Sequence, residues 1–182
     1  MLKCRINKRE IRPRCTNLIA SLMSKTEHKR YIQMELDRYP AIRPDKRRWI
    51  IAHAFGEIDL RKTGQLLTTD EKKHLGLQPR RFVSSAMISL VEPAFLPVFD
   101  IDEALSLIIA NARNKYRISR VWDEMVLDLC TSKVEFTTSN DAMTCHWCKA
   151  HDHKLFARDF NLPRHIEKNC NCIWFRGRVA AV

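Results

Sequence analysis

The feature of this sequence that most constrains its fold is a concentration of cysteine and histidine near its C-terminal end. The stretch "TCHWCKAHDHKLFARDFNLPRHIEKNCNCIWFR", residues 144–176, holds four of the seven cysteines and four of the seven histidines. Cys145 and Cys148 form a CxxC pair, and Cys170 and Cys172 form a CxC pair twenty-one residues later. A CxxC turn places two thiolates on one side of a tight knuckle, at about the separation that tetrahedral zinc requires. The spacing therefore predicts a metal site.

The second pair of cysteines completes a set of four ligands. A site with four protein ligands has no open position for water or substrate, so we expect a structural Zn²⁺ that stabilises a segment too short to build its own core. Because the geometry of CxC is tighter than that of CxxC, His165 is an alternative ligand to one of the CxC cysteines. The candidate ligands are Cys145, Cys148, Cys170, Cys172 and His165. The histidines in and after the knuckle, His146, His151 and His153, are expected to be exposed.

Three chemical interpretations compete with a structural site. A thioredoxin-like redox pair needs a βαβ setting, which the surrounding helical pattern does not supply. A zinc deaminase shows HxE before PCxxC, whereas His165 and Glu167 follow the CxxC here and no proline precedes Cys145. An HNH-type nuclease would use the histidines of "AHDHK", residues 150–154, without the expected downstream Asn and His. We therefore expect a protein that is not an enzyme, with a metal-dependent nuclease as the remaining catalytic alternative.

The cysteine segment resembles the C-terminal segment of the Mu F-like phage head-morphogenesis (minor head) proteins. The matching positions are Cys145, Cys148, Asp152, Lys154, Phe156, His165, Cys170 and Cys172, within about 45 residues, a quarter of the chain. His153 stands where that family has glycine, and four residues separate His165 from the CxC pair where the family has two. The resemblance implies a structural metal site and a phage or mobile-element origin.

Upstream of the cysteines, the sequence predicts a mainly α fold. We expect a helical body of about five helices, followed by a small C-terminal zinc-stabilised β element. At 182 residues, the chain has room for one main domain and a small appendage. The predicted division is a basic N-terminal arm at 1–15, a helical domain at 16–132 and a zinc-binding module at 133–182.

Apolar periodicity and helix-capping residues indicate where the individual elements lie. They predict a helix over 16–39, another opened by Pro44, and two helices over 100–116 and 118–130 that pack together. "KVEFTT", residues 133–138, is the first convincing strand, and "KLFARDF" and "CIWFR" are candidate strands after it. Residues 57–93 suggest either two ordinary helices or a helix-turn-helix whose second helix is opened by Pro79.

The charge of the chain, +11, is unevenly distributed. Residues 1–50 hold 14 Lys and Arg against 5 Asp and Glu, residues 51–143 hold 11 against 13, and residues 144–182 hold 7 against 3. Basic ends favour a polyanionic partner such as nucleic acid, because Lys and Arg release condensed counterions on meeting phosphates. The alternative is a basic surface without a dedicated partner. The candidate nucleic-acid contacts are Lys46, Arg47, Arg48, Arg80 and Arg81.

These patterns together predict a non-enzymatic, zinc-containing protein that binds nucleic acid, DNA or RNA, as a possible subunit of a larger nucleoprotein assembly. The alternative is a phage minor-head or other assembly protein in which the zinc module contacts protein partners. No apolar run suggests a signal sequence or a membrane span, so we expect a cytoplasmic, intracellular protein with no membrane partner, or a virion-associated one in the assembly alternative.

Overall fold

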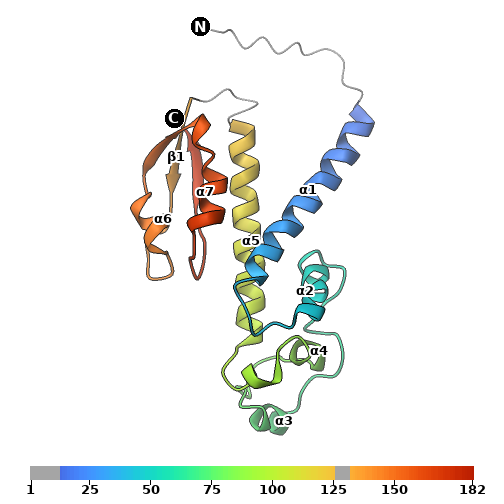
Figure 1. The fold of residues 1–182 in the computed structure, drawn as a ribbon. Helices are drawn as coiled ribbons and strands as arrows, with labels where there is room; N and C mark the ends of the chain where they lie inside the picture. Colours follow the sequence, from blue (N-terminus) through green and yellow to red (C-terminus); the bar gives the residue numbers. More distant parts are fainter. Residues whose placement is uncertain (1–12, 126–131) are drawn as a thin grey trace. The chain divides into compact units, whose positions relative to one another are not determined.

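The computed structural model describes residues 13–125 and 132–182. About half of the chain is helical, and the described residues include a small three-stranded antiparallel sheet. The structure divides into two compact units: residues up to 28 together with 113–182 form the first unit, and residues 29–112 form the second. Two long helices, α1 (Pro13–Leu36) and α5 (Ile101–Asp123), contribute residues to both units (Figure 1). The predicted boundary at residue 132 falls inside the first unit, and most of the predicted basic arm lies outside the described residues.

Helix α1 confirms the helix expected over 16–39, although it begins earlier, at Pro13, and ends at Leu36, before Pro40. A proline in the first turn is tolerated because the first amides of a helix have no intrahelical acceptor. The expectation of a break between two paired helices, at 100–116 and 118–130, is wrong, although residues 126–130 lie outside the described part of the chain. Residues 101–123 form one continuous helix, because no glycine or proline interrupts the chain there and the Asp100 carboxylate accepts a hydrogen bond from the Glu103 amide, 3.1 Å, at its start.

The second unit packs short helices and loops around an apolar core. Its elements are η1 (Pro44–Lys46), α2 (Arg47–Ala54), α3 (Thr69–His74), α4 (Ser85–Ile88) and η2 (Pro93–Phe95). Figure 1 shows α2, α3 and α4 as separate short helices linked by extended loops. The core consists of buried apolar side chains from most of these segments: Ile32, Leu36, Ile42, Ile50, Leu60, Met87, Leu90, Ile101, Leu105 and Ile108.

The helix that Pro79 was expected to open is not present, so the helix-turn-helix alternative is wrong. Residues 79–81 form a turn and a bend, and α4 begins only at Ser85. Two local interactions account for the difference. Leu66 forms an antiparallel bridge with Ser84, which requires extended backbone, and the Ser84 hydroxyl accepts a hydrogen bond from the Met87 amide, 3.2 Å, as the N-cap of α4.

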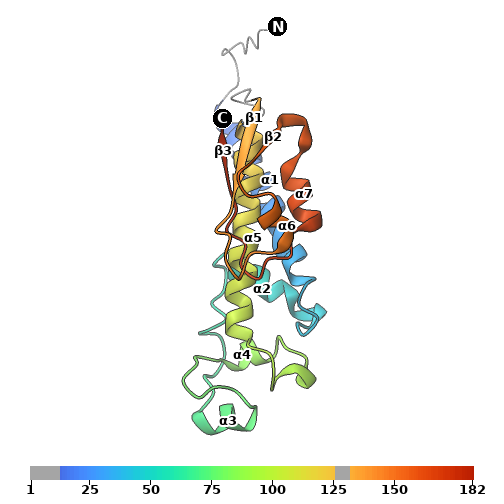
Figure 2. The ribbon, with the colours of Figure 1, turned by 90° about the vertical axis from the view of Figure 1, so that its left-hand side faces the viewer.

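The sheet of the first unit consists of β1 (Lys133–Thr137), β2 (Lys154–Ala157) and β3 (Arg178–Ala181), in the order β2-β1-β3 (Figure 2). Both pairings are antiparallel, with Val134 opposite Phe156 in β2 and opposite Ala181 in β3. The strands expected at "KVEFTT" and at the start of "KLFARDF" are confirmed. The strand expected at "CIWFR" is wrong, because the third strand begins later, at Arg178.

The segments that carry the cysteines lie between these strands. Helix α6 (His146–Ala150) precedes β2, and η4 (Arg158–Phe160) and α7 (Leu162–Asn169) follow it. One apolar cluster holds the sheet, α7 and the end of α5 together: Ile118, Trp122, Val134, Phe136, Cys148, Phe156, Leu162, Ile166, Cys170, Cys172 and Phe175. Gly177 permits this packing, because a Cβ atom there would lie 2.6 Å from the Phe175 ring and 2.7 Å from the Phe136 ring.

None of the helices within the described residues combines the length and the apolar character that crossing a lipid bilayer requires.

Candidate metal centre

The CxxC pair lies at the start of helix α6. Cys145 occupies the N-cap position in extended conformation, and Cys148 lies in the first turn and is completely buried. The Lys149 amide donates to the Cys145 carbonyl, 3.0 Å, so a helical turn closes between the two cysteines. This turn brings both thiols to the same side of the chain, as the spacing predicted.

The CxC pair lies at the other end of the module, where helix α7 ends. Cys170 is the C-cap residue, and its amide donates to the Ile166 carbonyl, 2.9 Å. The next residues run alongside the CxxC segment: the Cys145 amide donates to the Cys172 sulfur, 3.2 Å, and the Ile173 amide donates to the Met143 carbonyl, 3.1 Å. These hydrogen bonds hold the two cysteine pairs against each other.

Among the residues that the structure describes, the four cysteines form the group that could hold a metal ion. Their Sγ atoms all lie within 4.8 Å of one another, Cys145 is partly exposed, and the other three are buried. In a tetrahedral zinc site with Zn–S bonds of about 2.3 Å, sulfur atoms are about 3.8 Å apart. Side-chain adjustments of about 1 Å or less would therefore bring all four sulfurs to bonding distance of one ion.

Without a cation, these thiols cannot all ionise together. Hydrogen bonds from the thiols of Cys148 and Cys172 lower the pKa of Cys170 to about 2, so one thiolate is stabilised by its neighbours. The hydrogen bond to Cys170, followed by the one to Cys172 and by burial, raises the pKa of Cys148 far above its usual range. The cluster thus favours one negative charge shared among protonated thiols, and a divalent cation would allow the remaining thiols to ionise.

Helix α5 supplies a positive charge to this region. Lys115 is only 4% exposed, and its ammonium nitrogen lies 5.8 Å from the centroid of the Phe175 ring. The side-chain amide of the neighbouring Asn114 donates to the Phe175 carbonyl, 2.7 Å, so this turn of α5 holds the segment that follows the CxC pair. The Lys115 charge also contributes to the low pKa of Cys170. A buried ammonium offsets part of the negative charge of clustered thiolates.

The structure places His165 outside the cysteine group. Its imidazole stacks on the Phe160 ring with 4.2 Å between ring centroids, on the exposed side of α7. His151 also packs on aromatic rings, those of Trp147 and Phe156, and its Nδ1 lies 2.8 Å from the Trp147 carbonyl oxygen. His153 is exposed and lies 2.9 Å from a Glu135 carboxylate oxygen. His151 and His153 therefore contact different partners, and neither joins the group that could hold a metal.

The candidate nucleic-acid contacts at the start of α2 have different surroundings. Arg47 is paired with Asp37 and donates to the Leu36 carbonyl, so its guanidinium is used within the fold. Arg48 is exposed and lies over the Trp49 ring, 5.7 Å from the ring centroid, and Lys46 is half-buried. Arg48 is the best placed of the three to contact a phosphate.

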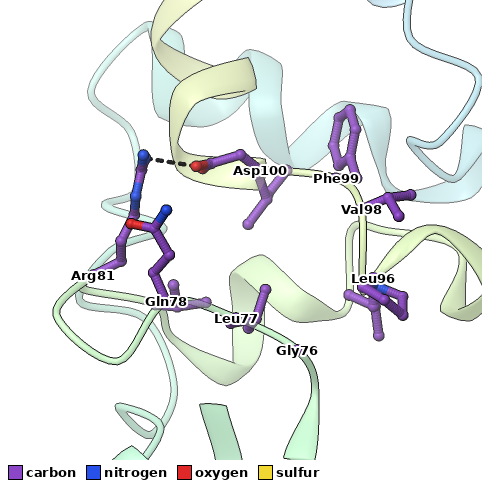
Figure 3. A pocket seen from close by; sticks show the side chains of 11 residues that line it. Gly76, Leu77, Gln78, Arg81, Leu96, Val98, Phe99 and Asp100 are labelled. Carbon is purple, nitrogen blue, oxygen red and sulfur yellow. Dashed lines mark ion pairs between the residues drawn. The ribbon is translucent and has the colours of Figure 1, made fainter. Parts of the chain in front are cut away.

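Arg80 and Arg81 occupy the turn that precedes α4. Arg81 is ion-paired with Asp100, 2.7 Å, and Figure 3 shows its side chain extending to that carboxylate along one side of a small pocket of about 170 Å³. Arg80 is exposed and, within residues 13–125 and 132–182, has no ion pair or hydrogen bond from its side chain. Arg81 is therefore ion-paired within the fold, whereas Arg80 is exposed to solvent.

Sequence reasoning missed the contribution of α5 to the cysteine region. Ile108, Ala112, Lys115, Ser119 and Trp122 recur at helical spacing, and all five are buried. That periodicity contained the signal, because it places a lysine on the apolar stripe of the helix. Because two separate helices were expected, ending at 116 and beginning at 118, the pattern was not followed across residue 117.

Comparison with protein-family models, with curated proteins and with solved structures found no match to this chain.

Proposed function

We propose that Cys145, Cys148, Cys170 and Cys172 bind one Zn²⁺ ion, and that this ion is structural. The observation that carries the proposal is the convergence of four sulfur atoms within 4.8 Å, from two segments twenty-one residues apart. Four thiolates around one ion leave no coordination position for a substrate, and thiolates favour zinc over the hard cations Mg²⁺ and Ca²⁺. The ion would join the start of α6 to the end of α7, where a three-stranded sheet alone supplies a small core.

Metal analysis of the purified chain tests this proposal. We expect one zinc per chain, and Co²⁺ substitution should give the intense visible absorption of a tetrahedral thiolate site. Cys148→Ser should abolish both signals. His165→Ala should retain both, because the imidazole lies on Phe160 and not in the cysteine group. Loss of metal in His165→Ala with retention in Cys172→Ser would overturn the four-cysteine assignment in favour of ligation by histidine.

We propose further that the protein binds nucleic acid and is not an enzyme. The net charge of +11 supports this function, together with exposed cationic side chains such as Arg48 and Arg80 that are available to phosphates. The exposed Arg48 and Trp49 pair combines a charge with an aromatic face, which is a common arrangement at nucleic-acid surfaces.

The salt dependence of binding separates this function from a merely basic surface. The affinity of the zinc-loaded protein for single-stranded and duplex DNA and RNA should fall steeply as salt rises, with a slope set by the number of phosphates neutralised. Arg48→Gln should remove about one phosphate contact, and the slope of log affinity against log salt concentration should become correspondingly shallower. No binding at low salt, or binding that does not change with salt, would contradict the proposal.

A second candidate is an assembly protein that uses the cysteine module to contact other proteins, as the resemblance to Mu F-like head-morphogenesis proteins suggests. Ile173 and Trp174 favour this candidate, because both are substantially exposed directly after the CxC pair. An Ile173→Ser, Trp174→Ser double variant should then lose self-association or partner binding and keep its metal. Unchanged assembly behaviour in this variant would argue against it.

A further inference from the structure

The second unit contains an open groove whose side chains do not contribute to the metal centre. Its cavity volume is about 1150 Å³, and it is lined by two loop segments, residues 59–66 and 80–82, together with Asp102 at the start of α5. Two apolar side chains on its walls are exposed to solvent: Phe82 is 73% exposed and Leu66 is 52% exposed. Because both side chains line the same groove, they form an exposed apolar surface of the kind that marks an interaction site.

The two walls of the groove are fixed relative to each other. The Leu67 amide donates to the Val83 carbonyl, 3.0 Å, and the Ser85 amide donates to the Gln65 carbonyl, 2.8 Å. Ser84 is fully buried, and its hydroxyl donates to the Leu60 carbonyl, 2.6 Å. The groove is therefore held open by backbone pairing within the unit.

Gly64 adds a further constraint to this part of the groove. Its φ is +78°, and a Cβ atom there would lie 2.4 Å from the Ser85 hydroxyl oxygen, which accepts a hydrogen bond from the Gln65 amide. A left-handed glycine with no room for a side chain keeps the loop close to the start of α4. The position of Leu66 on the wall follows from this close approach.

Four cationic side chains line the groove, two of them braced by carboxylates. The Arg61 Nε atom lies 2.8 Å from Asp102, and Arg81 is held by Asp100 (Figure 3). Lys62 is 86% exposed and 3.6 Å from Asp59, a surface contact of little energetic value. Arg80 lines the same groove as Phe82 and has no ion pair within the described part of the chain. The groove thus presents an exposed aromatic ring flanked by available positive charge.

We propose that this groove binds single-stranded nucleic acid, with one base stacked on Phe82 and adjacent phosphates bound by Arg80 and Lys62. The inference rests on the proposed nucleic-acid function and assigns it a site. Stacking on an aromatic ring is available only where bases are unpaired, so the groove prefers single strands to duplex. Sequence preference is expected to be weak, because every base has a face that can stack.

The test compares the affinity of the full chain for a labelled oligothymidylate and for a duplex of equal length. Phe82→Ala should weaken single-strand binding about tenfold, as expected for the loss of one stacked base, and change duplex binding much less. Its control is Val98→Ala, which removes an exposed apolar side chain outside the groove.

Arg80→Gln should lower the salt slope for single strands by about 0.7, and Phe82→Ala should leave the slope unchanged. Arg158→Gln, an exposed arginine of the other unit, is the control for charge.

The possible outcomes distinguish this site from the general function. If Phe82→Ala binds oligothymidylate as tightly as Val98→Ala, while the wild type binds in a salt-dependent manner, the groove assignment is wrong and nucleic-acid binding is retained. The exposed ring would then belong to a protein contact. If the wild type binds neither single strand nor duplex, both proposals fail. Circular dichroism of each variant shows whether the fold is intact, which is expected because all four substituted side chains are exposed.

Discussion

Lys115 is the residue that most directly connects the helical part of the first unit with the cysteines. It lies on the buried stripe of α5, over the Phe175 ring, and its charge favours a thiolate at Cys170. A bound Zn²⁺ with four thiolates carries a net charge of −2, so an ammonium nearby would stabilise the loaded site. Lys115 thus contributes electrostatically to the cysteine group, in addition to packing on the buried side of α5.

Replacing Lys115 with methionine keeps the length of the side chain and removes its charge. We expect Lys115→Met to bind zinc about ten- to a hundredfold more weakly, which is the usual effect of removing a group that supports metal ligands. Competition with a chromophoric chelator measures this change. Arg120→Met removes an exposed charge from the same helix and serves as the control. Equal zinc affinity in the two variants would show that Lys115 acts only in packing.

His153 gives a prediction about pH. The hydrogen bond to Glu135, and then the charge of Asp152, raise the pKa of His153 above its usual value of 6.5. Because the folded pKa is raised, the pairing contributes stability that is fully present below pH 6.5 and is lost as pH rises through the folded pKa. An NMR titration of the His153 ring should show this raised pKa. Glu135→Gln should lower it, and an unchanged titration in that variant would contradict the assigned cause.

At the scale of elements, the continuity of α5 is the most consequential difference between prediction and structure. Arg117 lies inside this helix, six residues before its end at Asp123, and is exposed. Arg117→Pro should lower the free energy of unfolding by about 3 kcal/mol or more, because proline removes a helical hydrogen bond and clashes with the preceding turn. Arg117→Ala should change it by less than about 0.5 kcal/mol. Denaturant unfolding of both variants measures the difference, and equal values would indicate two separate helices.

Local sequence signals predicted several elements correctly. They failed where contacts between distant segments determine the backbone conformation. The CxxC knuckle and β1 depend on neighbouring residues, and both appear as predicted. The segment after Pro79 had helical signals, but pairing of residues 65–67 with 83–85 keeps it out of a helix. No local pattern shows that pairing. For the same reason, the sequence suggested the four cysteines but not the lysine that α5 brings to them.

The choice between His165 and a fourth cysteine shows the same limit. Spacing alone allowed either residue, because both lie near the end of α7. The structure distinguishes them through packing: the His165 imidazole stacks on the Phe160 ring, while the Cys145 amide donates to the Cys172 sulfur. Aromatic stacking of this kind depends on where β2 and η4 place their side chains, which residue spacing does not reveal.

At the scale of the whole molecule, the two compact units offer different chemistry. The first unit contains the four cysteines, and the second contains the groove with its exposed phenylalanine. If zinc is structural, its removal should unfold the sheet and α7 and leave the core of the second unit to unfold separately. A metal ion that binds only the folded state adds about 4 kcal/mol of stability when its free concentration exceeds Kd a thousandfold.

The most direct test of a structural zinc is thermal unfolding of the full chain before and after treatment with a strong chelator. Near-ultraviolet circular dichroism should follow the aromatic side chains of the first unit, among them Trp122, Trp147 and Phe175. If zinc is structural, chelation should abolish the contribution of these side chains to the signal or lower its midpoint by many degrees, and Zn²⁺ should restore it whereas Mg²⁺ should not. If the chelated protein is shown to be free of metal and unfolds with the same transition as the untreated protein, the zinc is not structural.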